Sequence, residues 1–402
     1  MRAVRDIVLK QASTAERLGR GHPWVWRDAI GRGLDGASAG EEVQILGPDG
    51  TPAGRGLADP GSPIAVRRWT RRREPIDAAL WRSRALRACD RRDPMFVGEK
   101  TDAFRVLHGE GDRMPGFVVD RYGAVAVARA DGPAAAARMG ELADALWPSL
   151  EARGVRTLVL RAGVKGEKPT FEVLRGIPPP DTVEVMEHGV PFVVDLARGQ
   201  KTGAFLDQRD NRHRVGELGR GRRVLNLFSY AGGFSLHAAL GGATHVTSGD
   251  IASAAHATAQ ASFRAAGVEP GAHAFVTAEV SAFLEAAVAR GQQWDLVISD
   301  PPSFAPSEKA LPRALSAYRS LHGACARVLA PRGILCAASC SSHVDPATFL
   351  STLDDAALGE GAEGAEGADR ELTLLELRGA GLDHPTLPAF PEGRYLKFAI
   401  LA

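Results

Sequence analysis

Two residues of this sequence stand where an enzyme would place reactive groups. Asp300 opens the segment Asp300-Pro301-Pro302, and Cys340 is the centre of Ser339-Cys340-Ser341. Each follows a short apolar run that reads as a buried strand, and open α/β sheets bind ligands beyond the carboxyl ends of their strands. A thiolate there can add to C6 of cytosine, which makes C5 able to attack a methylsulfonium. The alternative for Cys340 is a small buried apolar residue, the role expected for Cys325 and Cys336.

A second segment predicts the binding site for a methyl donor. Residues 223–240 read as a strand, a turn at Gly232-Gly233 and a helix, and glycine lets a ligand approach the backbone closely. Asp250 ends the next apolar run, 17 residues past Gly233, close to the roughly 20 expected of a ribose-binding acid. A strand–glycine–helix turn without a ligand would look similar. Together with Asp300, these features indicate a class I S-adenosylmethionine-dependent methyltransferase rather than a dehydrogenase.

The composition excludes several other classes of protein. A chain of 402 residues predicts two or three domains. Its apolar runs are broken by charge or proline, and its first residues lack the apolar core of a signal peptide, so neither a membrane span nor export is expected. The four cysteines have no Cys-x-x-Cys spacing, which favours neither a metal site nor disulfides. We therefore expect a cytoplasmic protein without a metal.

The basic residues are concentrated in the first quarter of the chain. Residues 1–92 carry 18 basic residues against 11 acidic ones, whereas the whole chain has a net charge of +1. This asymmetry predicts a polyanion partner, RNA, although an arginine-rich solvated surface is the plainer reading. The residues expected to bind RNA are Trp24, Arg67, Arg68, Arg71, Arg72, Arg73 and Lys201. Trp24 would stack on bases if it is exposed, but core packing is the commoner role of tryptophan.

Turn residues and periodicity divide the chain into three predicted domains. Residues 1–73 read as a β-rich domain, with short runs between glycine, proline and aspartate turns. Residues 74–182 read as a small α+β domain, in the order strand, strand, helix, strand, strand. It includes a hairpin that turns at Tyr122-Gly123 and a helix from Pro133 to Leu150. Residues 183–402 form the last domain, in which the triplet repeat at 361–369 reads as a mobile surface insertion.

A polar segment precedes the glycine turn. Residues 199–212 combine glycine and phenylalanine with many hydrogen-bonding side chains, among them Asp207, Gln208 and Arg209. A loop that simply enters a helix is one reading. The density of polar groups favours a lid over cofactor or substrate.

Many segments together resemble a known family. They are Gly21-His22-Pro23-Trp24-Val25, 107–112, 118–123, 201–203 with 205–209, Asn226 to Phe234, Asp300-Pro301-Pro302, Ser339-Cys340-Ser341, Asp383-His384-Pro385 and Tyr395-Leu396-Lys397. The chain resembles, over nearly its whole length, the PUA-domain-containing class I methyltransferases that make 5-methylcytosine in large-subunit ribosomal RNA. The resemblance implies an α/β fold: an N-terminal PUA domain, a central EEHEE domain and a Rossmann-like methyltransferase domain.

The resemblance also implies roles for individual residues. Residues 228–232 would hold the methionine end of the cofactor, Asp250 its ribose, and Glu279 would lie near its adenine. Asp300 would contact the target base and Cys340 would be the nucleophile. The expected cofactor-binding residues are Phe205, Asp207, Gln208, Arg209, Asn226, Phe228, Ser229, Tyr230, Gly232, Asp250, Glu279 and Asp300. The chain departs from the family pattern at Gly249, where an apolar residue is usual, at Glu279, usually aspartate, and at Ser262, commonly asparagine.

Two other functions stay open at this stage. Asp300-Pro301-Pro302 with Phe304 resembles a motif that grips an exocyclic amine in base N-methyltransferases, although the aromatic residue comes one place late. The chain could also be an RNA-binding or ribosome-assembly protein without turnover, which the intact Asp250, Asp300 and Cys340 argue against. The expected partners are RNA and a second copy of the chain in a homodimer, with no membrane.

Overall fold

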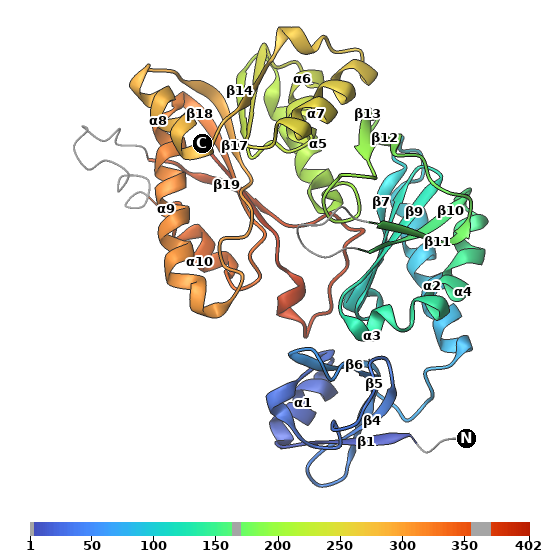
Figure 1. Ribbon diagram of the computed structural model, residues 1–402. Helices are drawn as coiled ribbons and strands as arrows, with labels where there is room; N and C mark the ends of the chain where they lie inside the picture. The colour runs from blue at the N-terminus through green and yellow to red at the C-terminus, as the bar shows by residue number, and fades with distance from the viewer. Residues whose placement is uncertain (1–3, 163–169, 355–370) are drawn as a thin grey trace. The chain divides into compact units, whose positions relative to one another are not determined.

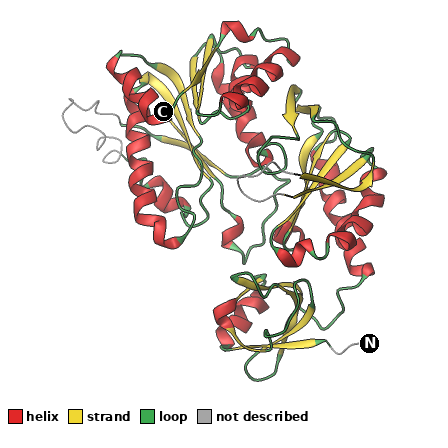
Figure 2. Cartoon of the chain, viewed as in Figure 1, coloured by secondary structure: helices red, strands yellow, loops and turns green. Residues whose placement is uncertain are grey.

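Short strands and helices follow one another along the described residues, joined by loops and turns (Figure 1, Figure 2). The computed structural model describes residues 4–162, 170–354 and 371–402, so the predicted insertion at 361–369 lies outside the described residues. The chain forms two compact units. The first contains Met1–Val183, Leu196–Gly203 and Leu382–Gly393; the second contains Glu184–Asp195, Ala204–Gly381 and Arg394–Ala402.

The first unit begins with a six-stranded sheet in the order β2-β6-β5-β4-β1-β3. Its elements are β1 (Arg5–Leu9), α1 (Ala12–Arg20), β2 (Trp24–Trp26), β3 (Ile30–Arg32), β4 (Glu42–Leu46), β5 (Pro52–Ala58) and β6 (Ile64–Thr70). Alternating apolar residues such as Ile7, Val43 and Ile45 are fully buried and form its core with Leu18 of α1. The sheet is rich in short strands, as the sequence predicts for this part of the chain.

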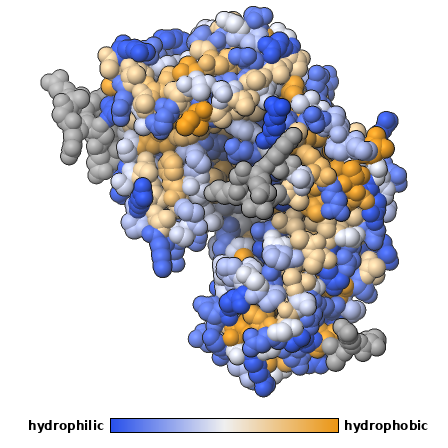
Figure 3. Space-filling model, in the orientation of Figure 1, coloured by the Kyte–Doolittle hydropathy of each residue, from blue (hydrophilic) through white to orange (hydrophobic). Residues whose placement is uncertain are grey.

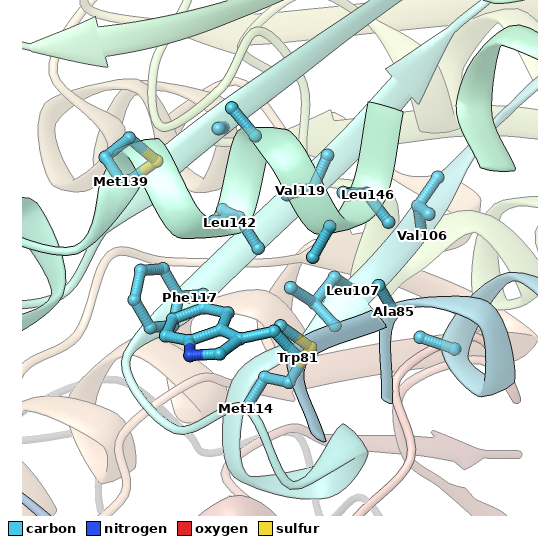
Figure 4. Packing of buried hydrophobic residues seen from close by; sticks show 14 of the residues in the cluster. Trp81, Ala85, Val106, Leu107, Met114, Phe117, Val119, Met139, Leu142 and Leu146 are labelled. Atoms are coloured by element: carbon cyan, nitrogen blue, oxygen red, sulfur yellow. The ribbon is translucent and has the colours of Figure 1, made fainter. Parts of the chain in front are cut away.

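A second sheet of five strands follows in the same unit, in the order β11-β10-β9-β8-β7. Its elements are α2 (Ala78–Arg92), β7 (Ala103–His108), β8 (Phe117–Tyr122), β9 (Val125–Ala130), α3 (Pro133–Ala136), α4 (Met139–Glu151), β10 (Thr157–Ala162) and β11 (Thr170–Gly176). Leu142 and Leu146 of α4 and Trp81 of α2 pack into its core with Phe117 and Val119 of β8 (Figure 4). Burying each of these side chains contributes roughly 1.5–3 kcal/mol.

Two details of this sheet differ from the sequence prediction. Residues 103–130 form three strands, so the sheet has one strand more than the order strand, strand, helix, strand, strand. The hairpin at Tyr122-Gly123 is present, because β8 and β9 pair antiparallel. The predicted helix from Pro133 is interrupted at Arg138, whose φ of −116° is outside the helical range and whose guanidinium donates to the Gly40 carbonyl at 2.9 Å. The division at residues 73 and 182 remains a proposal, since one compact unit contains both sheets.

The second unit is built on a seven-stranded sheet in the order β16-β15-β14-β17-β18-β20-β19. Its strands are β14 (Arg223–Leu227), β15 (His245–Asp250), β16 (Ala274–Thr277), β17 (Trp294–Ser299), β18 (Leu329–Ser339), β19 (Leu374–Arg378) and β20 (Lys397–Leu401). Its helices are α5 (Arg209–Gly219), α6 (Gly233–Leu240), α7 (Ser253–Ala265), α8 (Val280–Ala289), α9 (Leu311–Arg327) and α10 (Pro346–Leu350), and β12 (Thr182–Glu187) pairs with β13 (Val190–Asp195). Strands β14 to β18 are parallel, and β20 is antiparallel to both of its neighbours. This sheet confirms the predicted α/β fold class.

The parallel register brings four strand ends into one row. Leu227 of β14 lies between Gly249 of β15 and Ser299 of β17, and Ser299 is in turn paired with Ala337 of β18. The residues that follow these positions therefore emerge along a single edge of the sheet. Asp250, Asp300 and Cys340 all come from this edge, as the sequence predicts.

A buried ion pair supports helix α6 behind the glycine turn. Arg212 of α5 donates from two nitrogens to the carboxylate of Glu187, and His237 of α6 bonds the same carboxylate at 3.0 Å. Burial alone would raise the pKa of Glu187, but the charge and hydrogen bonds of Arg212 more than offset it and hold that pKa below its usual value. Any side chain at Gly233 would meet this arginine, because a Cβ there would lie 2.7 Å from Arg212 Cδ.

Replacing Glu187 with alanine should therefore destabilise the protein by about 3–5 kcal/mol, because Arg212 would be left buried without its partner charge. Glu217→Ala is the matched control, since Glu217 is half-exposed and pairs with Arg214 on the surface of the same helix. That control should cost about 0–1 kcal/mol. Chemical denaturation measures both, and equal losses would contradict the role assigned to the buried pair.

Candidate active site

The turn after β14 has an unusual backbone. Phe228 and Tyr230 adopt positive φ angles of 54° and 46°, which residues other than glycine rarely take. Gly232 also has a positive φ of 74°, and a Cβ there would lie 2.7 Å from the Cβ of Ala259. Such strain concentrates at ligand-binding sites and persists only where the surrounding structure holds it in place.

Polar groups beneath the turn hold it in place. The Asn226 amide donates to the Ser235 hydroxyl at 2.8 Å, and that hydroxyl lies 2.7 Å from the Ser248 hydroxyl. The Ser229 N–H donates to the carbonyl of Gly249 at 3.0 Å. Asn226 is thus buried under the turn, where it supports the backbone.

Asp250 fixes the other side of the turn. One carboxylate oxygen accepts the Tyr230 N–H at 2.8 Å, and the other accepts the Ala252 N–H at 2.8 Å. Each oxygen keeps a further lone pair for a ligand hydroxyl. Asp250 therefore links β15 to the glycine turn.

The three departures from the family pattern have distinct surroundings. Gly249 has room for a Cβ, whose nearest neighbour would be Leu227 Cδ2 at 3.7 Å. The exposed Glu279 caps helix α8 by accepting the Ala282 N–H at 3.0 Å. Its pKa is lowered by hydrogen bonds from Ser281 and from the Ala282 backbone. Ser262 is buried and accepts the Val193 N–H at 3.0 Å.

The polar segment before α5 joins the same site. Phe205 packs edge-on against Tyr230, with ring centroids 5.3 Å apart. Gln208 donates to Asp300 Oδ2 at 3.1 Å, and Asp207 accepts the Tyr395 hydroxyl at 2.7 Å. This segment therefore connects the glycine turn to Asp300.

The remaining members of the segment point to a structural role. Arg209 is buried and donates to Asp210 at 3.0 Å. Asn211 was not singled out in the sequence. Its amide donates to the side-chain oxygen of Gln208 at 2.7 Å, which orients Gln208 towards Asp300.

Cys340 is half-buried at the end of β18, flanked by two serines that fix its loop. The Ser341 hydroxyl lies 3.0 Å from the Ser303 hydroxyl and 3.1 Å from that of Tyr318. Tyr318 also donates to Ser339 at 3.0 Å. These bonds tie the cysteine loop to the loop that follows Asp300.

Lys397 lies beside this loop, directly across from Ser339 in the pairing of β18 with β20. Its ammonium donates to the carbonyls of Ser341 at 2.6 Å and Tyr395 at 2.8 Å. Burial lowers the pKa of Lys397 to about 8, with Cys340 and Asp345 acting in the opposite direction. Lys397 appeared in the sequence only as part of a closing motif, because its proximity to Cys340 depends on a strand that pairs from far along the chain.

The other cysteines are buried, as expected. Burial raises the pKa of the thiols of Cys89 and Cys325 to about 12, and raises that of Cys336 further. These three thiols are therefore protonated and unreactive near neutral pH. Only Cys340, among the described cysteines, has an accessible side chain.

The residues predicted to bind RNA all belong to the first unit. Arg67 is buried, and its guanidinium contacts the carboxylates of Glu110 and Asp131. Trp24 donates to Glu110 at 2.7 Å and packs on Phe390, so it is not a free stacking platform. Arg71, Arg72, Arg73 and Lys201 are exposed, while Arg68 is buried. Hydrophilic residues cover much of the surface visible in Figure 3.

Neither a metal centre nor a membrane helix appears in the part of the chain that the structure describes. No group of three or more His, Cys, Asp or Glu side chains there is arranged to hold a metal ion. No helix of these residues is long and apolar enough to cross a membrane.

The turn fits an adenosyl cofactor. The Ser229 hydroxyl is buried and has no hydrogen-bond partner among the described residues. The side-chain oxygen of Asn226 is also buried and has no partner among these residues. A ligand at this turn would satisfy such groups, since buried polar atoms rarely stay unbonded. The missing Cβ at Gly232 leaves the backbone open to close approach.

Two known families match separate parts of this chain. Residues 135–359 match the S-adenosylmethionine-dependent methyltransferase family, and residues 7–71 match the PUA-like domain. A methyltransferase crystallised with SAH has the same fold, with a TM-score of 0.86 and 21% identity over 99% of this chain and 100% of that chain. A SAM-dependent methyltransferase from Streptococcus mutans gives a TM-score of 0.85 at 21% identity, with the same coverage. The class is thus a methyltransferase that carries a PUA-like domain.

Sequence relatives make the assignment more particular. The chain is 35% identical to "Ribosomal RNA large subunit methyltransferase I" of Photobacterium profundum, over 94% of this chain and 95% of that protein. It is 33% identical to the protein of the same name from Vibrio parahaemolyticus, over 94% of each. The chain therefore belongs to the S-adenosylmethionine-dependent methyltransferase family, and S-adenosylmethionine is its cofactor.

Replacing Asp250 with alanine should weaken S-adenosylmethionine binding by about 1.5–3 kcal/mol, the range for hydrogen bonds to charged groups. Asp295→Ala is the matched control, because Asp295 also accepts a backbone N–H, that of Arg223 at 2.8 Å, but at the amino end of the same sheet. Calorimetry with S-adenosylmethionine compares the variants. Equal affinities for both would remove Asp250 from the cofactor site.

Lys397 predicts a pH-dependent contribution to stability. Its folded pKa of about 8 is below the ordinary 10.5, so the unfolded chain holds the proton more tightly. Stability from this group therefore increases as pH rises from about 8 to 10.5, by up to about 3 kcal/mol. Denaturation of wild type and Lys397→Met across that range measures the effect as their difference, with the exposed Lys309→Met as control. A difference that does not change with pH would contradict the depressed pKa.

Proposed function

We propose that this protein transfers a methyl group from S-adenosylmethionine to C5 of a cytosine in large-subunit ribosomal RNA, with Cys340 as nucleophile. The proposal rests on one observation above all. Asp300 and Cys340 follow neighbouring parallel strands at the edge that also carries the glycine turn and Asp250. The names of the relatives support ribosomal RNA as the substrate class.

The reaction needs a cytosine turned out of its stack, because a base within a helix cannot reach a thiol at a sheet edge. When bound, S-adenosylmethionine supplies an electrophilic methyl group. The sulfur of Cys340 bonds to C6, and the electron pair of the C5–C6 double bond forms the new bond from C5 to the methyl carbon. The bond from that carbon to the sulfonium sulfur breaks in the same step, and its electron pair stays on the departing thioether. A base then removes the C5 proton, the double bond returns, and the sulfur leaves as thiolate.

The surroundings of Cys340 suit these steps. The positive charge of Lys397 favours the thiolate, which is the reactive form of cysteine. Asp300, oriented by Gln208, would hold the edge of the cytosine ring. The Ser341 hydroxyl fixes the spacing of the two loops, since it contacts both Ser303 and Tyr318.

The cofactor contacts follow from the strained turn. We assign the methionine end to residues 228–232, the ribose to Asp250 and the adenine side to Glu279. Phe205 and Gln208 would cover the site from the polar segment. Asp207 and Arg209 act on the cofactor through the backbone and side chains that they hold, because each is buried.

Base N-methylation is the rival reaction. It would use Asp300 and the following prolines to grip an exocyclic amine, with Phe304 stacked on the base. Phe304 instead packs on Tyr318, with ring centroids 4.8 Å apart. This contact favours the thiol route. A binding protein without turnover is the other rival, and the complete set of Asp250, Asp300 and Cys340 favours an enzyme.

We propose that the PUA-like domain binds RNA. Since ribosomal RNA is found in the cytoplasm, we also expect the enzyme there. We keep Arg71, Arg72, Arg73 and Lys201 as candidate phosphate contacts because they are exposed. Arg67 and Trp24 instead serve the packing around Glu110. The homodimer stays an expectation.

Cys340→Ala should abolish methylation while S-adenosylmethionine binding stays near that of wild type, because the thiol acts on the base and not on the cofactor. Mass spectrometry of nucleosides from RNA treated with each enzyme measures 5-methylcytosine. Cys336→Ala is the control, since this buried thiol should affect only stability. Substantial turnover by Cys340→Ala would contradict the thiol mechanism and favour base N-methylation.

RNA that carries 5-fluorocytosine at the target should trap the wild-type enzyme. Fluorine at C5 cannot be removed as a proton, so the C6–sulfur bond cannot break after methyl transfer. The adduct should survive denaturing electrophoresis and be absent with Cys340→Ala. Wild-type enzyme that methylates normal RNA yet forms no adduct would rule out the covalent route.

A further inference from the structure

A cationic cavity in the first unit is lined by five arginines. It has a volume of about 120 Å³, well above the roughly 10–15 Å³ that one water needs on the same measure. The arginines that line it are Arg68, Arg71, Arg72, Arg84 and Arg113. Two carboxylates, Glu74 and Glu110, also line it, but Glu110 already accepts hydrogen bonds from Arg67 and Trp24. The cavity therefore has an excess of positive charge.

Two of these arginines are buried without a partner charge. Arg68 and Arg84 are each 6% exposed, and neither forms an ion pair with another described residue. The Nε and Nη1 atoms of Arg68 have no hydrogen-bond partner in the part of the chain that the structure describes, nor has Nε of Arg84. Buried cations are costly unless a charge or several hydrogen bonds compensate them.

The remaining bonds of the two side chains hold their positions. Arg68 donates once, to the carbonyl of His22 at 3.3 Å. Arg84 donates to the carbonyls of Trp69, at 2.8 Å, and Arg113, and lies over the Trp69 ring at 5.3 Å. Trp69 lines the same cavity, and its indole N–H also lacks a partner among the described residues. Several hydrogen-bond donors of the lining residues are therefore unused.

Electrostatics point in the same direction. Burial, with the nearby charges of Arg71 and Arg113, lowers the pKa of Arg68 to about 10. Burial, with Arg87 and Arg113, lowers the pKa of Arg84 to about 10 as well, although Glu74 opposes the shift. Each cation is therefore held at a cost that an anion would remove.

We propose that this cavity binds a backbone phosphate of the substrate RNA through Arg68, Arg84 and the Trp69 N–H. Guanidinium groups match the geometry of phosphate oxygens, and a phosphate brings the negative charge that both buried cations lack. The proposal rests on the proposed function for its substrate, but the site follows from the cavity. Phosphate contacts fix the position of a nucleic acid without reading its sequence. The cavity would thus be an anchor for RNA.

The cavity includes part of the basic run predicted in the sequence and adds arginines from elsewhere in the chain. Arg68 of β6, Arg71 and Arg72 belong to that run, whereas Arg84 of α2 and Arg113 do not. Arginines gathered around one cavity suit a single bound anion, whereas an exposed run would provide only diffuse attraction.

Arg68→Gln is the test variant and Arg82→Gln its control, because Arg82 is exposed on the same helix as Arg84 but does not line the cavity. Arg68→Gln should weaken binding of a ribosomal RNA fragment about tenfold. It should also reduce the slope of log affinity against log salt by about 0.7–0.9, the loss of one phosphate contact. Its melting temperature should equal or exceed that of wild type, since an unpaired buried cation is gone. Arg82→Gln should change none of these by a comparable amount.

Inorganic phosphate separates two sources of the anion. It should raise the melting temperature of wild type and not of Arg68→Gln. Equal RNA affinity and equal salt slopes for Arg68→Gln and Arg82→Gln would overturn the proposal. This holds even if inorganic phosphate stabilises wild type, because the cavity would then bind a free anion and not RNA. Failure of wild type itself to methylate RNA would count against the proposed function, while the binding measurements would still decide the role of the cavity.

Discussion

The alignment of four parallel strands determines what this protein can do. Leu227, Gly249, Ser299 and Ala337 share one level of the sheet. A shift of one residue in any of these pairings would turn its side chains to the opposite face and displace the loop that follows. The glycine turn, Asp250, Asp300 and Cys340 each depend on that level, because each lies within a few residues of it.

The loops beyond this edge are held by polar contacts that reach across the sequence. Ser341 connects the loops after β17 and β18, and Gln208 connects the segment before α5 to Asp300. Under the glycine turn, the side chains of Asn226, Ser235 and Ser248 form hydrogen bonds with one another in place of water. Preorganised groups of this kind stabilise developing charge without having to rearrange during reaction. The site is therefore rigid where the chemistry demands fixed distances.

Local patterns in the sequence were sufficient to predict the strands, the glycine turn and the acids at the sheet edge. A strand followed by Gly232-Gly233 or by Asp300-Pro301 leaves few other structures available to the chain. Contacts between distant segments were not predictable in the same way. Arg67 was expected on the surface, but its partner Glu110 lies 43 residues further along the chain and turns it inward. Lys397 was missed as a neighbour of Cys340 for the same reason, since nothing near it in the sequence indicates which strand it pairs with.

The chain does not complete its two units in the order in which it is made. The first unit includes Leu382–Gly393, where Asp383 accepts the Arg105 N–H at 2.8 Å and its carbonyl accepts a hydrogen bond from Arg92. Both arginines are buried, so the part of the protein that leaves the ribosome first cannot reach its final hydrogen bonding until residues translated near the end have arrived. Domains that are contiguous in sequence usually fold one after another during synthesis. Here the first unit completes these hydrogen bonds only after its late segment has been made.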